Sequence, residues 1–87
     1  MNDERFALEW LVPGQSDRLT HVMLLDRERA APFAVAVGYG ADKAHALLSL
    51  WRTLIKDAES AEAIEYVAGE YTRRAGTVPQ LRDEGSH

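Results

Sequence analysis

The 87-residue sequence contains no cysteine and no long apolar run, and these absences exclude several classes of protein. A chain without cysteine cannot form disulfides, thiolate nucleophiles or cysteine-rich zinc sites, and it suits a reducing compartment. No stretch approaches the roughly 18 apolar residues of a transmembrane helix. The first residues also lack the basic and then apolar pattern of a signal peptide. We therefore expect a cytoplasmic protein without a membrane partner.

Lysine is scarce as well. Fourteen acidic residues outnumber ten basic ones, of which only two are lysines, and the net charge is −4. Binding to a phosphate backbone draws on clustered lysine and arginine, so a nucleic-acid partner is disfavoured. A chain of this length forms one domain. We predict a single domain over residues 1–76, followed by a flexible tail over 77–87, where Pro79 and mixed charges replace the apolar pattern.

Three segments have the two-residue apolar period of β-strands. They cover residues 5–12 and 19–26 and a third stretch that begins at Phe33, after Pro32. Pro13 and Gly14 begin a short turn-forming segment between the first two strands, which favours a hairpin over a parallel crossover. In the third strand large residues alternate with alanine and glycine, so one of its faces is unusually small. The pattern predicts an antiparallel meander.

Two helices are predicted after the strands. Residues 41–58 repeat apolar side chains at helical spacing, with Asp42 as the cap or first-turn acid. Ser60 can cap a second helix that ends before Gly76; whether the two helices form one bent rod stays open. The largest residue of the first stripe is Trp51, whose truncation would cost roughly 3–5 kcal/mol if it were core. The stripe consists of Ala44, Leu47, Leu48, Trp51, Leu54, Ile55 and Ala58, with Leu50 at its edge.

This order of elements predicts an α+β fold, a three-stranded antiparallel meander (β-β-β-α-α) with the helices packed on one face. The expected bed for Trp51 is the sheet face with Phe6, Leu8, Trp10, Phe33, Val35 and Val37. The opposite face is too apolar for free exposure, so we predict a homodimer that forms through the sheet. The predicted interface residues are Leu11, Val22, Met23, Leu24, Ala34 and Ala36.

A resemblance to known families is confined to residues 33–55. The run Phe-Ala-Val-Ala-Val-Gly-Tyr-Gly at 33–40, followed by Asp42 and Lys43 and then a leucine-rich helix, resembles the last strand and helix of HicB-like antitoxins. It is also similar, more distantly, to double-stranded-RNA-binding domains. Both families place a three-stranded antiparallel sheet against a helix. The HicB-like resemblance implies homo-oligomerisation and binding of a small toxin.

No residue pattern points to catalysis, a cofactor or a metal. His21, His45 and His87 have no second ligand at metal-binding spacing, and no serine lies in a Gly-x-Ser-x-Gly elbow. Asp42 and His45 stand one helical turn apart and could form a local pair, but no nucleophile accompanies them. The acidic series Glu59, Glu62, Glu65 and Glu70 fits the solvated start of a helix. We predict that the protein is not an enzyme.

The leading hypothesis is therefore a small non-enzymatic protein-interaction module. One alternative is nucleic-acid binding, in which Tyr39 or Trp10 would stack on bases and arginines would contact phosphates. The arginines proposed for that role are Arg5, Arg18, Arg27 and Arg29. Another alternative is a small enzyme whose site is shared across a dimer interface and uses His21 or His45 beside acids from the second chain.

Overall fold

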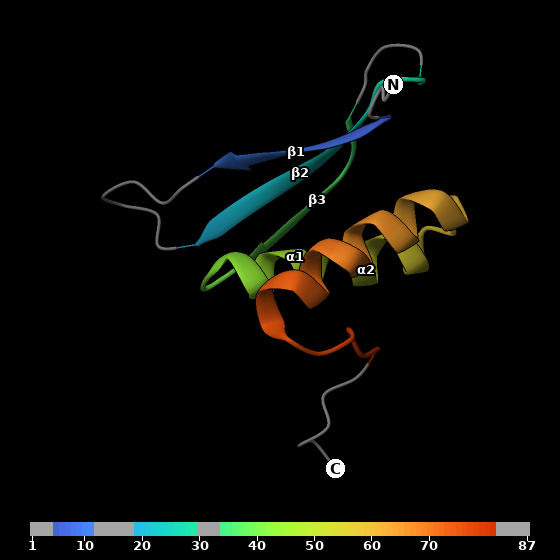
Figure 1. Ribbon diagram of the computed structural model, residues 1–87. Helices are drawn as coiled ribbons and strands as arrows, with labels where there is room; N and C mark the ends of the chain where they lie inside the picture. Colours follow the sequence, from blue (N-terminus) through green and yellow to red (C-terminus); the bar gives the residue numbers. More distant parts are fainter. Residues whose placement is uncertain (1–4, 12–18, 30–33, 82–87) are drawn as a thin grey trace.

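The computed structural model describes residues 5–11, 19–29 and 34–81. Strands β1 (Phe6–Leu11), β2 (Thr20–Asp26) and β3 (Ala34–Gly40) are followed by helices α1 (Lys43–Lys56) and α2 (Ala61–Ala75). The strands form one antiparallel sheet in the order β1-β2-β3, and both helices lie on the same side of it (Figure 1). This confirms the predicted α+β fold. The predicted turn that begins at Pro13, the start of the third strand at Phe33, and residues 82–87 of the predicted tail lie outside the described residues.

The helix boundaries follow from their capping residues. Asp42 caps α1, where its side chain accepts a hydrogen bond from the His45 N–H at 2.9 Å, and Ser60 caps α2 by accepting from the Ala63 N–H. Gly76 ends α2 in the left-handed conformation that glycine adopts without steric cost. Between the helices, Ala58 has a φ of 56°. The chain therefore turns sharply there, and α1 and α2 are two separate helices that pack against each other within one chain.

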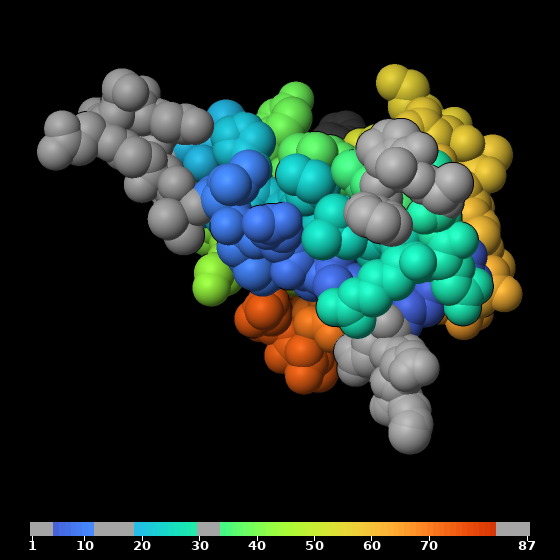
Figure 2. Space-filling model, turned by 90° about the horizontal axis from the view of Figure 1, so that it is seen from above, coloured from blue at the N-terminus to red at the C-terminus, as the bar shows by residue number. Residues whose placement is uncertain are grey.

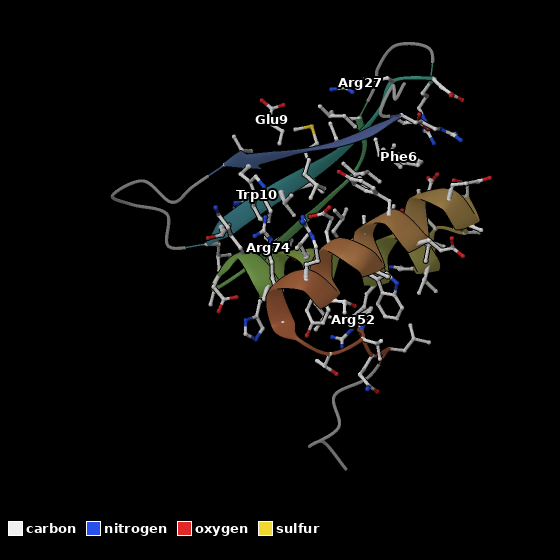
Figure 3. The ribbon with its side chains drawn as sticks, viewed as in Figure 1. Phe6, Glu9, Trp10, Arg27, Arg52 and Arg74 are labelled. Carbon is white, nitrogen blue, oxygen red and sulfur yellow. The ribbon has the colours of Figure 1, made fainter. Side chains whose placement is uncertain are left out.

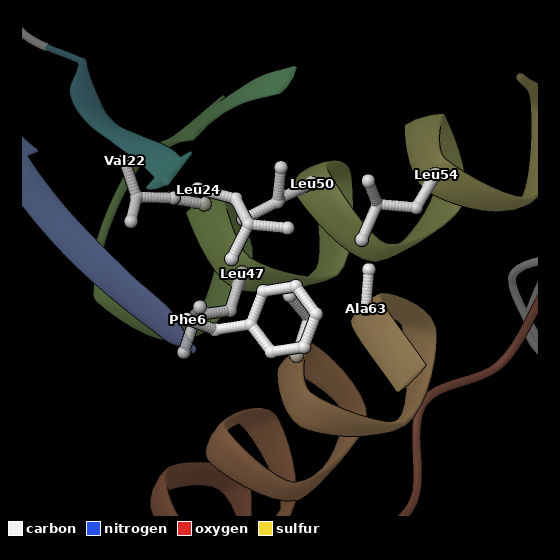
Figure 4. Close-up of a cluster of buried hydrophobic side chains, with 9 residues drawn as sticks. Phe6, Val22, Leu24, Leu47, Leu50, Leu54 and Ala63 are labelled. Carbon is white, nitrogen blue, oxygen red and sulfur yellow. The ribbon is translucent and has the colours of Figure 1, made fainter. Parts of the chain in front are cut away.

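The core lies between the sheet and the helices (Figure 4). Leu47, Leu50 and Leu54 of α1 are fully buried in one cluster with Val22 and Leu24 of β2. Trp51 is half-buried at the margin of this cluster. Trp51, the largest residue of the predicted stripe, therefore does not lie at the centre of the core, because the helix is rotated so that Leu50, placed at the stripe's edge by the sequence, points into the core.

The helix α1 packs on β3 at main-chain distance. A Cβ on Gly38 would stand 2.5 Å from the carbonyl oxygen of Ala46, and one on Gly40 would stand 2.6 Å from the Cβ of His45. Only glycine allows this approach. The small residues of β3 therefore face the helices, and Val37, which the sequence assigned to the helix side, points away and is 42% exposed. Val35 packs against the core, close to an irregularity in the pairing at Leu24 and Leu25.

The helix α2 meets β1 through large side chains. The rings of Phe6 and Tyr66 lie 5.4 Å apart, and Arg74 lies over the ring of Trp10. The two layers are consequently close together at β3 and α1 and held apart by aromatic residues at β1 and α2. After α2 the chain returns along α1, where Arg52 donates a hydrogen bond to the carbonyl oxygen of Gln80 at 2.9 Å.

Candidate interaction surfaces

The sheet face turned away from the helices, which we call the outer face, is largely apolar. It follows from the alternation of each strand: Val22 and Leu24 point into the core, so His21, Met23 and Leu25 point outward. On β1 the outward residues are Ala7, Glu9 and Leu11, and on β3 they include Val37 and Tyr39. Figure 2 shows this face, with strand residues at its centre and the atoms of α2 at its margin.

Three of the exposed large hydrophobic residues belong to this face: Leu11 (50% exposed), Val37 (42%) and Tyr39 (56%). The ring of Tyr39 lies 5.7 Å from that of His21 on the neighbouring strand. Glu9 is the one acidic residue on the outward positions of the described strands, and it points away from the helices (Figure 3). Exposed apolar side chains gathered on one face in this way mark interaction sites in soluble domains.

The structure divides the predicted interface residues between the two faces. Leu11 and Met23 lie on the outer face, whereas Val22 and Leu24 are fully buried beneath the helices and cannot contact a second chain. Ala36 packs against the core, and Ala34 is half-buried. Sequence reasoning confused the faces because both sets of alternate residues in β2 are apolar.

Val37 and Tyr39 were missed as outer-face residues, although a signal for them existed. They alternate with Gly38 and Gly40, and glycines that precede a helix are the positions at which that helix can approach the strand most closely. Had the glycine face been assigned to the helices, the neighbouring large residues would have been placed on the outer face.

The two edges of the sheet differ. At the β3 edge, α1 lies over the strand and the Tyr39 N–H donates a hydrogen bond to the Ser49 hydroxyl at 3.2 Å. At the β1 edge, no residue in the described part of the chain pairs with the strand from outside. At the β3 edge a helix side chain thus accepts a hydrogen bond from one main-chain donor, whereas at the β1 edge the described residues leave the outward main-chain groups available.

Two cations meet on the ring of Trp10 at the end of β1. The Nζ of Lys43 and the Cζ of Arg74 each lie 5.2 Å from the ring centroid, and they come from the start of α1 and the end of α2. Figure 3 shows Trp10 on the helix side of the sheet with Arg74 beside it. Within residues 5–11, 19–29 and 34–81 neither cation has an acidic partner. The aromatic ring attracts both cations but has no net charge, so their positive charge is not neutralised.

The arginines predicted to contact nucleic acid are placed differently from one another. Arg5 forms two hydrogen bonds with Asp26, at 3.0 and 3.1 Å, and Arg29 forms an ion pair with Glu59 at 3.0 Å. The hydrogen bond from Arg5 holds the pKa of the buried Asp26 carboxyl below its usual value. Arg27 is exposed, and Arg18 lies outside the described residues. Two of the four arginines are therefore committed to structural ion pairs.

The histidines and acids form no larger constellation. His45 Nδ1 lies 2.8 Å from Asp42 Oδ1 on an exposed helix end, and the pKa of Asp42 is lowered first by the His45 main-chain N–H and then by its ring. Of the acidic series, Glu59 and Glu70 pair with arginines. In the described segments no group of three histidine or acidic residues could hold a metal ion. His87 lies outside them.

Among residues 5–11, 19–29 and 34–81, no helix is long and apolar enough to cross a bilayer. The sequence matches no protein-family model, and neither a curated protein nor a solved structure matches it significantly. The resemblance of residues 33–55 to HicB-like and double-stranded-RNA-binding modules therefore stays a prediction.

Proposed function

We propose that the protein is a non-enzymatic cytoplasmic interaction module that forms a homodimer through the outer face of its sheet and binds a further macromolecule. The observation that carries this proposal is the outer face itself, where Leu11, Val37 and Tyr39 are each more than 40% exposed while both helices lie on the opposite side. Burying such a surface in an interface is favourable by roughly 25 cal/mol for each Å² of apolar area removed from water.

The polar groups of the outer face favour a second copy as its occupant. Glu9 and His21 occupy diagonal positions on neighbouring strands, because Glu9 is opposite Met23 and His21 is opposite Leu11. A two-fold arrangement of two outer faces can therefore bring Glu9 of each chain to His21 of the other, and the remaining contacts are apolar. Self-complementarity of this kind is what an isologous dimer requires.

The test is the molar mass in solution, measured by light scattering over a concentration series. We expect a mass twice the 9.7 kDa of one chain, and we expect Val37→Glu to shift the protein to monomer. Val78→Glu is the matched control, because Val78 is also exposed but lies after α2 and away from the sheet. Circular dichroism verifies that both variants remain folded.

Two results would count against the proposed dimer. One is a monomer at every concentration, and the other is equal dissociation of both variants, since the effect would then follow from added charge rather than from the outer face. A binding experiment with a small toxin of the kind that HicB-like antitoxins bind is a separate step, which the resemblance of residues 33–55 suggests.

A second candidate function, nucleic-acid binding, is favoured by one observation. Lys43 and Arg74 carry uncompensated charge beside the aromatic ring of Trp10, a combination that contacts phosphates and bases in other proteins. Filter binding of RNA and DNA at increasing salt concentration tests it, with Lys43→Gln compared with Lys56→Gln. Retention that does not change with salt, or that both variants reduce equally, would exclude this site.

A further inference from the structure

The open edge of β1 has a defined set of main-chain donors and acceptors. The Arg27 N–H donates to the Arg5 carbonyl at 2.8 Å, so these two residues form a hydrogen-bonded pair of the antiparallel ladder. Hydrogen-bonded and non-hydrogen-bonded pairs alternate along such a ladder. The main-chain groups of Ala7 and Glu9 therefore point toward β2, and those of Phe6, Leu8 and Trp10 point outward, to the edge.

The β1 edge has few of the features that usually prevent strand addition, and Glu9 is the one charged residue of the strand. Natural edge strands are protected by proline, lysine, bulges or a covering element. The β3 edge has partial protection, because the Tyr39 N–H donates a hydrogen bond to the Ser49 hydroxyl of α1, which packs on this strand. The sequence of β1, Phe-Ala-Leu-Glu-Trp-Leu, contains neither proline nor lysine, and its pairing with β2 is regular over all six residues.

The charge beside this edge is positive at one end. Lys43 and Arg74 lie over Trp10, at the end of β1, and neither has an acidic partner among the described residues. At the other end of β1, Arg5 is already neutralised by Asp26 and lies 3.6 Å from Glu28. An extended segment on the β1 edge would therefore meet uncompensated positive charge beside Trp10 only.

From these observations we infer that β1 binds an extended peptide segment of another protein as a fourth, antiparallel strand, with acidic side chains of that segment held by Lys43 and Arg74. Because the added strand runs opposite to β1, its N-terminal residues lie beside Trp10. The inference names the kind of macromolecule that the proposed module binds, and it uses a different surface from the proposed dimer interface.

Strand addition of this kind combines two sources of affinity. The main-chain groups of Phe6, Leu8 and Trp10 exchange hydrogen bonds with water for hydrogen bonds with the peptide, which is the general basis of β-augmentation. The two cations favour peptides whose acidic residues are at the N-terminal end. An acidic residue at the other end would lie beside Arg5, whose charge is already compensated.

The experiment uses three synthetic peptides of seven residues with blocked ends. The first begins with Asp-Glu and continues with alternating valine and threonine, the second has the reversed sequence, and the third has Lys-Lys in place of Asp-Glu. Binding to the full chain is followed by two-dimensional NMR of the main-chain amides. We expect the first peptide to bind most tightly and to shift the amide signals of Phe6, Leu8 and Trp10 more than those of Ala7 and Glu9.

Variants of both molecules test each source of affinity. Lys43→Gln should weaken binding of the first peptide about threefold to fivefold at low salt, as expected for an exposed charge pair. Lys56→Gln, the same change at the other end of α1, should leave the affinity unchanged. N-methylation of alternate peptide residues removes donors without altering the protein: one alternate set should abolish binding and the other should not.

The inference is overturned if the three peptides bind equally, if none binds at millimolar concentration, or if the amide shifts fall on the outer face or on β3. Those outcomes are independent of the light-scattering test of the dimer. If the protein is a monomer and binds the acidic peptide, strand addition is supported and the proposed homodimer is wrong. If it is a dimer and does not bind the peptide, only strand addition is wrong.

Discussion

Gly38 of β3 lies directly against the main chain of Leu50 in α1. A Cβ atom on Gly38 would overlap the Leu50 nitrogen and stand 2.5 Å from the carbonyl oxygen of Ala46. Main-chain atoms of a helix cannot move aside as the end of a flexible side chain can. The distance between sheet and helix is therefore set by the absence of a side chain at this one position.

We expect Gly38→Ala to destabilise the protein by about 2–3 kcal/mol or more, because α1 must move away from β3 and loosen the packing of its leucines. Gly69→Ala is the matched control. It lies in α2 with no atom within 4 Å of an added Cβ, so it should stabilise by up to about 1 kcal/mol. Urea denaturation measures both. Similar effects of the two substitutions would show that α1 does not pack on β3 at main-chain distance.

The element order, both helix caps and the antiparallel meander could all be predicted from sequence, because each depends on local signals. Asp42 and Ser60 act as caps through hydrogen bonds to residues three positions later, and the strands follow from their two-residue period. Local chemistry of this kind needs no knowledge of the tertiary arrangement.

The rotation of α1 and the assignment of the sheet faces could not be predicted with the same reasoning. The helix has apolar residues over more than half of its circumference, so its period allows several rotations, and the predicted stripe included Trp51 and placed Leu50 at its edge. The actual rotation depends on a contact between distant residues, Gly38 and Leu50. The open β1 edge and the two cations on Trp10 likewise depend on which elements become neighbours.

The second prediction compares adjacent residues of α1. Leu50 is fully buried, whereas Trp51 is half-buried. Leu50→Ala should cost about 3 kcal/mol, within the range for a leucine that leaves a cavity in the core. Trp51→Ala removes more atoms than Leu50→Ala, but it should lower the free energy of unfolding by only roughly half of the loss expected for a fully buried tryptophan. Unfolding followed by circular dichroism gives both values, and a larger loss for Trp51→Ala would place the helix in the rotation that the sequence first suggested.

The third prediction concerns pH. The hydrogen bond from Arg5 lowers the pKa of Asp26 below the ordinary value of about 3.9 that it has in the unfolded chain. The folded state therefore binds the proton less readily than the unfolded state. The stability from this pair is fully present above the unfolded pKa and is lost as the pH falls through the lower, folded pKa.

Asp26→Asn isolates this contribution because it keeps the size of the side chain and removes its charge. The difference in Tm between the wild type and the variant should be constant from pH 6 to 8 and should shrink as the pH drops below about 4. Glu65→Gln, an exposed acid without an ion pair in the described segments, is the control. A difference in Tm that stays constant into the acid range would mean that the pair does not form.

The last prediction concerns the turn between the helices. Ala58 has a φ of 56°, and the Glu59 N–H after it donates to the Leu54 carbonyl at 3.0 Å, so the chain leaves α1 in the left-handed conformation. A Cβ is unfavourable there, and glycine removes this cost while adding some entropy to the unfolded chain. Ala58→Gly should therefore stabilise the protein by up to about 1 kcal/mol.

Gly76, at the end of α2, adopts the same left-handed conformation with a φ of 79°, but there the residue is already glycine. Gly76→Ala should therefore destabilise the protein by about 1 kcal/mol. Thermal unfolding of the two variants should shift Tm in opposite directions, and a loss of stability in Ala58→Gly would indicate that α1 continues past this turn and that the two helices do not fold back on each other within one chain.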